Sequence, residues 1–319
     1  MKLLTVINSK IPVKTYGGSQ RDVWAQGKEM VKMGHEVAFL AKKGSTCPFG
    51  DIIPYNEKLT LNEQIPDDVD IVHFHGPIRE EIRKPYMVTI HGNGQPGEIF
   101  DQNTVFVSKN HAKRHNSSRY VYNGLDLEEL GPVDLNAKRH HLLFLAKASR
   151  KIKNLKGSIE IAKRANRKLA VVGGKKLTLN PKIKYFGMLG GERKSAVIQQ
   201  SDALLFPVLW HEPLGLAILE SLYFGCPVFG TTFGSLPELI GNEFGFLSNS
   251  KSELVDALQQ IGDYDRKKCH EYICDNFSAK KMTEDYLKVY EEVLSGKKLN
   301  PKAPQSVITA KEPIFRMDP

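Results

Sequence analysis

Short apolar runs rich in β-branched residues alternate with helical patterns along most of this 319-residue chain. Such continuous runs are typical of strands buried on both faces of a parallel sheet. Between the first two runs, the segment from Ser19 to Gly34 has the pattern of a crossover helix. The chain therefore begins as a βαβ fold. The strands expected in this first part cover residues 3–7, 36–41, 70–75, 86–91, 104–108 and 119–123.

The same alternation restarts after a polar stretch with a proline, residues 131–140. Strands are expected at 142–146, 168–174, 183–187, 203–208 and 227–231, and helices at 156–166 and 191–200. From residue 252 the pattern is wholly helical, and the last 23 residues hold four prolines and no clear period.

These patterns predict an α/β protein with two Rossmann-like α/β/α domains that face each other across a cleft. We expect the domains at 1–130 and 141–276, joined by a linker at 131–140. A helix at 277–296 is expected to cross back to the first domain, and 297–319 to be a flexible tail.

Composition excludes several classes of protein. The apolar run from Ala203 to Trp210, among the longest, is far too short to span a bilayer. The four cysteines have no CxxC spacing, so neither a disulfide framework nor a zinc site is indicated. The N-terminal segment lacks the features of a signal peptide. We therefore expect a cytoplasmic protein.

The net charge is +9, with a pI near 9.2. This balance favours an anionic partner and does not choose among a nucleotide, a nucleic acid and a lipid headgroup. The alternative is a solvated basic surface with no specific partner.

The segment "WHEPLGLAILESLYFGCPVFGTT", residues 210–232, holds two glutamates eight positions apart in apolar surroundings. Pro213 is suited to a first helical turn, and Gly215 leaves the backbone bare, so the amides near Gly215 and Leu216 form an anion site. Glu220 lies about 7 Å further along the helix axis, at about 1.5 Å per residue. A nucleotide could place its diphosphate at the helix start and its ribose hydroxyls at Glu220.

Each glutamate also has a reading without a ligand. Glu212 precedes the helix, where it would face a group carried by the phosphates, or would simply be an acid favoured by the helix dipole. Glu220 would otherwise be a glutamate at the edge of the core, paired with a lysine.

The segment from Phe206 to Ile240 resembles the donor-binding segment of retaining glycosyltransferases of the GT-B fold, which include sucrose and glycogen synthases and bacterial lipopolysaccharide sugar transferases. This family 4-like class carries two glutamates separated by seven residues with a Gly-Leu step between them, matched here by Glu212, Gly215, Leu216 and Glu220. The resemblance implies that Glu212 holds sugar hydroxyls and that the run 213–216, with Glu220, binds the nucleotide. The residues of that run are Pro213, Leu214, Gly215 and Leu216.

The resemblance extends over most of the chain. "VINSKIPVKTYGGSQ" is similar to the family's first strand and diglycine loop, Gly17 and Gly18, which closes over the donor phosphates; Gln20 stands where the usual acid would be. "VTIHGN" is similar to the strand whose terminal histidine, here His91, sits at the donor sugar, and "VYNGLD" to the end of the first domain.

"LLFLAKASRKIKNLKGSIEIAKRANRKLAVVGG" resembles the start of the second domain, where an arginine and a lysine clamp the diphosphate. By position these are Lys147 and Lys153, with Arg150 or Lys156 as alternatives for either role. A lysine in the arginine position keeps the charge and loses the planar fork.

The resemblance implies transfer with retention, catalysed with His91 and Glu212. It also implies that the transfer is metal-independent, since no aspartate pair of the metal-binding kind is evident. The basic residues and helix amides would stabilise the departing diphosphate, which takes the acceptor proton. A UDP-sugar is favoured as the donor, with GDP- or ADP-sugars as alternatives, and no further cofactor is expected.

Three further expectations concern partners. The acceptor is an unidentified glycan or a lipid-linked molecule, peripheral contact with the anionic inner face of a membrane is compatible with the charge, and nucleic acid is not expected. Two alternative functions stay open: another sugar-nucleotide reaction of this fold, such as an epimerase or phosphorylase, and a non-catalytic basic protein that binds nucleic acid or lipid with a degenerate site. His73 and His75 share a strand face and are read as sheet-end residues rather than metal ligands.

Overall fold

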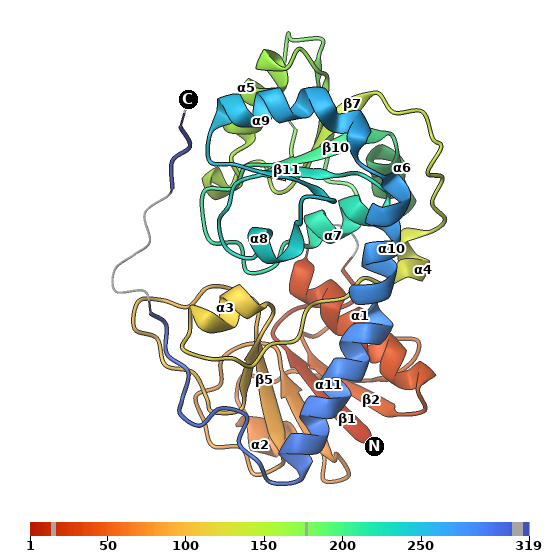
Figure 1. Ribbon diagram of the computed structural model, residues 1–319. Coiled ribbons are helices and arrows are strands. Elements are labelled where there is room, and N and C mark those ends of the chain that lie inside the picture. Colours follow the sequence, from red (N-terminus) through yellow and green to blue (C-terminus); the bar gives the residue numbers. More distant parts are fainter. Residues whose placement is uncertain (14–16, 176–177, 308–314, 319) are drawn as a thin grey trace. The chain divides into compact units, whose positions relative to one another are not determined.

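The computed structural model describes residues 1–13, 17–175, 178–307 and 315–318 (Figure 1). These residues divide into two compact units. The first contains residues 1–13, 17–125 and 278–307, and the second contains 126–175, 178–277 and 315–318. Within the described part of the chain, no helix is long and apolar enough to cross a membrane.

The first unit is built on a parallel six-stranded sheet in the order β3-β2-β1-β4-β5-β6. Its strands are β1 (Lys2–Ile7), β2 (Glu36–Ala41), β3 (Asp51–Pro54), β4 (Ile71–Phe74), β5 (Tyr86–Ile90) and β6 (Thr104–Phe106). Its helices are α1 (Gly18–Lys32), α2 (Leu61–Gln64), α3 (Lys109–Lys113) and α11 (Ala279–Leu294).

Alternate side chains of the first sheet fill two separate cores. On one face, Leu3 and Phe39 pack with α1 and with Tyr286 and Tyr290 of α11. On the other face, side chains such as Leu4 form a second cluster. Burial on both faces explains why the strands appear in the sequence as continuous apolar runs.

The second unit repeats the same winding, with the order β12-β11-β10-β7-β8-β9. Its strands are β7 (His141–Leu145), β8 (Leu169–Val172), β9 (Ile183–Gly187), β10 (Ser201–Phe206), β11 (Val228–Gly230) and β12 (Gly245–Leu247). Its helices are α4 (Leu127–Leu130), η1 (Lys151–Lys153), α5 (Leu155–Arg164), α6 (Gly191–Gln199), α7 (Leu216–Tyr223), α8 (Leu236–Leu239), α9 (Lys251–Ala257), η2 (Leu258–Asp263) and α10 (Arg266–Asn276).

Several sequence expectations are wrong in detail. Residues 119–123 form no strand, only an isolated bridge between Phe106 and Tyr120. The short strands β3 and β12 were not expected, because runs of three or four residues carry little periodic signal. The expected linker at 131–140 belongs to the second unit, where the Arg139 guanidinium donates to the carbonyls of Ser201 and Phe224.

The chain passes from one unit to the other at residues 125–126 and again at 277–278. An isolated bridge joins Leu125 to Ser278 at this double crossing. The helix expected at 277–296 is α11, which lies in the first unit against α1 (Figure 1).

The expectation of a flexible tail at 297–319 is wrong for its described residues. Residues 297–307 pack on the first unit, with Leu299 and Asn300 buried. The Asn300 side chain donates to the carbonyls of Gln102 (2.9 Å) and Thr104 (2.8 Å). Residues 315–318 lie in the second unit, where the Phe315 amide donates to the carbonyl of Leu209. The segment was misread because its hydrogen bonds leave no periodic pattern in sequence.

Replacement of Asn300 by alanine tests this packing. Because it leaves two carbonyls and the Ser117 hydroxyl without their buried partner, we expect the free energy of unfolding to fall by about 1–3 kcal/mol. Denaturant unfolding of Asn300→Ala measures the change, with the exposed Lys302→Ala as the control from the same segment. Equal, negligible effects of both substitutions would show that this segment is not packed in solution.

Candidate active site

The winding of the second sheet places two loops side by side. Its order reverses between β7 and β10, so the loops that follow these strands start from neighbouring carboxyl ends. Ligands of open α/β sheets bind at such a reversal. The residues predicted to bind the donor, Lys147 and Lys153 on one side and Glu212 to Glu220 on the other, all follow β7 or β10.

Backbone and side-chain bonds tie these two loops together. The Leu209 amide donates to the carbonyl of Ile152 (2.8 Å), and the Asn154 side chain donates to the carbonyl of Pro207 (2.9 Å). Lys153, at the end of η1, is therefore held facing the segment after β10. Its side chain is only 9% exposed.

Lys153 and Glu212 form a buried ion pair. The Lys153 ammonium lies 2.5 Å from Glu212 Oε2, and the Trp210 indole N–H donates to the same oxygen at 2.7 Å. Trp210 also lies under the cations of Arg150 and Lys153, at 5.4 and 5.0 Å from the ring centroid. Both donors converge on one oxygen, so Oε1 is left without a hydrogen-bond donor among the residues described.

The segment after β11 fixes the backbone of Glu212. Gly234 forms a parallel bridge with Glu212, and the Ser235 amide donates to the Glu212 carbonyl (2.9 Å). A Cβ at Gly234 would lie 2.2 Å from the Glu212 amide nitrogen, and φ there is +72°, so only glycine fits. This contact explains the Gly234-Ser235 step in the segment from Phe206 to Ile240.

Helix α7 starts later than the sequence suggested. It begins at Leu216, so the expectation that Pro213 occupies the first helical turn is wrong. Gly215 is the cap residue, with φ +96°, and a Cβ there would lie 3.3 Å from Glu212 Cγ. Leu214 is buried, and its carbonyl accepts from the Ser235 hydroxyl (2.8 Å). Gly215 thus brings the start of α7 directly against Glu212.

Glu220 has a protein partner. The ammonium of Lys194, from α6, lies 2.5 Å from Glu220 Oε1, and the two side chains are 6% and 8% exposed. This is the pairing that the sequence offered as the alternative to a ligand. Oε2 of Glu220 accepts no hydrogen bond from any other described residue.

The other basic candidates remain on the surface. Lys147, Arg150 and Lys156 are exposed, and the Arg150 guanidinium lies over the Trp210 ring. Among the described His, Cys, Asp and Glu side chains, no group of three or more is placed to hold a metal ion.

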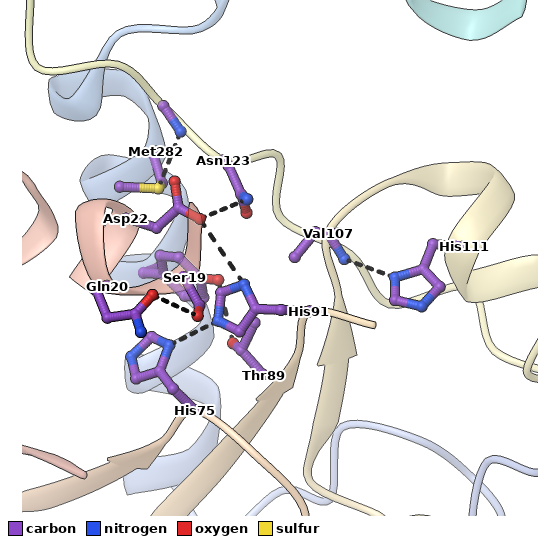
Figure 2. A network of polar contacts seen from close by, with 12 residues as sticks. Ser19, Gln20, Asp22, His75, Thr89, His91, Val107, His111, Asn123 and Met282 are labelled. Atoms are coloured by element: carbon purple, nitrogen blue, oxygen red, sulfur yellow. Dashed lines mark hydrogen bonds and ion pairs between the residues drawn. The ribbon is translucent and has the colours of Figure 1, made fainter. Parts of the chain in front are cut away.

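The first unit carries Gly17, Gly18 and His91. Gly17 caps α1, which starts at Gly18; residues 14–16 of the expected diglycine loop lie outside the described residues. His91 follows β5, with its Nε2 3.0 Å from His75 Nδ1 and its Nδ1 3.8 Å from Asp22 Oδ2 (Figure 2).

Two buried histidines hold the loop after His91. His111 Nε2 lies 3.0 Å from the Gly92 carbonyl oxygen, to which it donates, and His115 Nε2 accepts from the Gly94 amide at 3.0 Å. Burial lowers the pKa of His91 to about 4, and burial with the neighbouring His115 lowers the pKa of His111 to about 3. The His91 and His111 rings are therefore neutral at pH 7.

Sequence reasoning missed several of these residues. Lys194 shares the buried side of α6 with Val197 and Ile198, and Asp22 shares the buried side of α1 with Gln26. A charged residue at i with buried partners at i+3 and i+4 signals a paired charge in the interior. Trp210 carried no such signal, because its contact with Glu212 depends on the loop conformation.

The buried pair in α6 and α7 gives a stability prediction. Lys194→Met alone leaves the Glu220 carboxylate uncompensated, so we expect it to lower the free energy of unfolding by about 3–5 kcal/mol. The double variant Lys194→Met/Glu220→Gln removes both charges and should recover most of that loss. Denaturant unfolding of both variants measures this; a single variant as stable as wild type would show that the pair does not form.

The buried histidines give a prediction for pH. Because the unfolded chain binds protons near pH 6.5 and the folded rings do not, the free energy of unfolding should fall as the pH drops from 6.5 towards 4. Each histidine adds a slope of up to about 1.4 kcal/mol per pH unit. His111→Gln should make the dependence shallower, whereas His140→Gln, at an exposed position, should not. Equal slopes in all three proteins would contradict the assignment.

The second unit is similar in sequence to a known family. Residues 128–275 match the model of the family "Glycosyl transferases group 1". No protein among those with curated functions matches the sequence.

AviGT4, a glycosyltransferase involved in avilamycin A biosynthesis, is 20% identical, with a TM-score of 0.74. The match covers 92% of this chain and 98% of AviGT4. Sucrose-phosphate synthase from Thermosynechococcus elongatus is 15% identical, with a TM-score of 0.72 and coverage of 93% and 100%. HepE from Anabaena, solved with UDP and glucose, is 14% identical, with a TM-score of 0.64 and coverage of 92% and 100%. The chain has the GT-B fold of these proteins, and its residues 128–275 are similar to the glycosyl transferases group 1 family.

Proposed function

We propose that this protein transfers a sugar from a nucleotide-diphosphate sugar to a hydroxyl group, without a metal ion and with retention of the anomeric configuration. The observation that carries the proposal is the convergence of Lys153, Glu212 and the start of α7 at the reversal point of the second sheet. The Lys153 ammonium and the amides at the start of α7 fit a diphosphate, and the Oε1 atom of Glu212, which accepts no hydrogen bond from a described residue, fits a hydroxyl-rich group carried by that diphosphate.

The diphosphate would lie at the start of α7. Lys153 has three N–H donors and uses one on Glu212, so two remain for phosphate oxygens. The amides following Gly215 supply further donors. Together they would stabilise the charge that grows on the leaving diphosphate, which is usually the largest catalytic contribution in such sites. Lys147 and the diglycine step Gly17-Gly18 stay in the proposal as further phosphate contacts.

Glu212 would hold the transferred sugar. Its Oε2 is fixed by Lys153 and Trp210, and its Oε1 would accept hydrogen bonds from sugar hydroxyls. The leaving phosphate would take the proton of the attacking hydroxyl, so no separate carboxylate nucleophile is needed. His91 is the catalytic residue proposed from the first unit.

Glu220 would bind the ribose through Oε2, while Oε1 stays on Lys194. This modifies the expectation from sequence, in which the ribose alone was to satisfy Glu220.

The donor is proposed to be a UDP-sugar, with GDP- and ADP-sugars as alternatives. Among the similar structures, HepE was solved with UDP and starch synthase IV of Arabidopsis thaliana with ADP, which supports this class of ligand. A glycan or lipid-linked acceptor, with transient contact at an anionic membrane face from the cytoplasmic side, is proposed from the basic charge alone.

A binding and turnover experiment tests the two glutamates separately. Calorimetry of the purified protein against UDP-, GDP- and ADP-sugars identifies the donor, and release of free sugar without an acceptor reports the chemistry. Glu212→Gln should lower turnover by about 100-fold or more and leave the nucleotide affinity within a few-fold. Glu220→Gln, made in the Lys194→Met background, should weaken nucleotide binding by about tenfold or more.

The exposed Glu243→Gln is the matched control and should change neither value. If Glu212 and Glu220 variants both behave like this control, the proposed roles are wrong. Tight, strongly salt-dependent binding of nucleic acid without binding of any nucleotide sugar would favour the non-catalytic alternative.

A further inference from the structure

A second cluster of polar side chains lies at the carboxyl edge of the first sheet. Asp22 comes from α1, His75 follows β4 and His91 follows β5 (Figure 2). The His75 and His91 rings lie 3.0 Å apart at Nδ1 and Nε2, and the Asn123 side chain donates to Asp22 Oδ2 at 2.6 Å. The same Asp22 oxygen lies 3.8 Å from His91 Nδ1.

The order of the hydrogen atoms follows from these contacts. Each neutral imidazole carries one N–H, and the bond between the two rings needs one N–H and one lone pair. A lone pair on His91 Nδ1 would face the Asp22 oxygen unfavourably, whereas an N–H there is attracted to it. His91 therefore carries its hydrogen on Nδ1 and accepts at Nε2 from the N–H of His75 Nδ1.

This order leaves His75 Nε2 as a bare acceptor. That nitrogen is buried and has no hydrogen-bond partner among the described residues. The neighbouring His73, whose ring centroid lies 4.0 Å away, has no hydrogen to offer it. His73 Nδ1 and Nε2 are engaged by the hydroxyls of Tyr290 (2.8 Å) and Thr89 (2.7 Å).

The hydrogen bonds between His73 and its neighbouring hydroxyl groups can also be assigned a direction. The Gln26 amide donates to the Tyr290 oxygen at 2.8 Å, so the Tyr290 hydroxyl hydrogen is free to donate to His73 Nδ1. His73 then donates from Nε2 to Thr89. Both ring nitrogens of His73 are therefore hydrogen-bonded, whereas the lone pair on His75 Nε2 has no donor among the described residues.

We propose that Asp22, His91 and His75 form a relay whose terminal nitrogen, the buried His75 Nε2, accepts the hydrogen of a substrate hydroxyl, with Asp22 as the positioning residue. The inference rests on the proposed function in one respect, that the substrate is a hydroxyl-rich sugar or polyol. The relay changes the assignment for this edge, because His91 Nε2 is engaged by His75 and His91 Nδ1 faces Asp22 at 3.8 Å, beyond hydrogen-bond distance, so that His75 offers the acceptor.

The relay fits a neutral hydroxyl group better than an anion. An anionic oxygen has no hydrogen to donate and would meet the lone pair of His75 Nε2, which repels it. A hydroxyl supplies the missing O–H donor and satisfies a buried acceptor that otherwise costs stability.

The ring nitrogens can be observed directly. Nitrogen-15 NMR of the full chain without substrate, with signals assigned by His75→Gln and His91→Gln, distinguishes protonated from bare imidazole nitrogens. We expect both His91 and His75 in the Nδ1–H form at pH 7. Hydrogen on Nε2 of either ring in the wild-type protein would overturn the relay, and this measurement needs no variant of Asp22.

Asp22→Asn tests the positioning role. An amide at this site no longer fixes the His91 hydrogen on Nδ1, so we expect the His91 and His75 rings to become mixtures of the two tautomers. The control is Asp51→Asn, on the exposed edge strand, which should leave the spectrum unchanged. In turnover assays Asp22→Asn and His75→Gln should each lower kcat by about 10- to 100-fold with little change in nucleotide affinity.

Unchanged tautomers in Asp22→Asn would overturn the proposal even if kcat falls. If no nucleotide sugar binds to the protein, the proposed function fails, while the tautomer measurement still decides on the relay. The two failures are therefore distinguishable.

Discussion

The contact between Lys153 and Glu212 is the interaction on which the candidate active site depends. It joins the loop after β7 to the loop after β10, and the doubly wound order makes these loops neighbours. Gly234, Ser235 and the start of α7 are then arranged around the Glu212 backbone. The motif residues around Glu212 are therefore explained by the need to hold one carboxylate in one place.

The two glutamates of the motif are both paired with lysines, but their surroundings differ. Glu212 precedes a helix on a loop, with a second donor from Trp210 and one oxygen left over. Glu220 lies inside α7 and receives a single buried ammonium. A buried ion pair contributes little net stability compared with apolar residues, and the loss of one partner is costly. The structure places one such pair at each of the two glutamates proposed to bind the donor.

The architecture could be predicted from sequence because its strands are buried on both faces. The helices expected at 156–166 and 191–200 lie within one or two residues of α5 and α6. The strands of three or four residues, β3 and β12, could not, since they have too few positions to show a period. The segment 297–307 was misread for a related reason. It is held by side chains such as Asn300, whose partners are nearly two hundred residues away.

The candidate site was predictable to the same degree. The positions of Glu212, Gly215 and Glu220 followed from the motif, whereas the partners Lys194 and Trp210 depended on packing between elements. The same holds for Asp22 and His75 in the first unit, which come from separate elements and meet only at the sheet edge. Sequence spacing locates residues along one element, and contacts between elements require the fold.

The most direct test of the central claim is hydrogen–deuterium exchange of the full chain with and without the nucleotide diphosphate that binds it. The account predicts that the ligand slows exchange of the amides in two segments, residues 147–156 and 212–220. Binding that leaves both segments unchanged and slows exchange elsewhere would contradict the placement of the donor at Lys153 and Glu212.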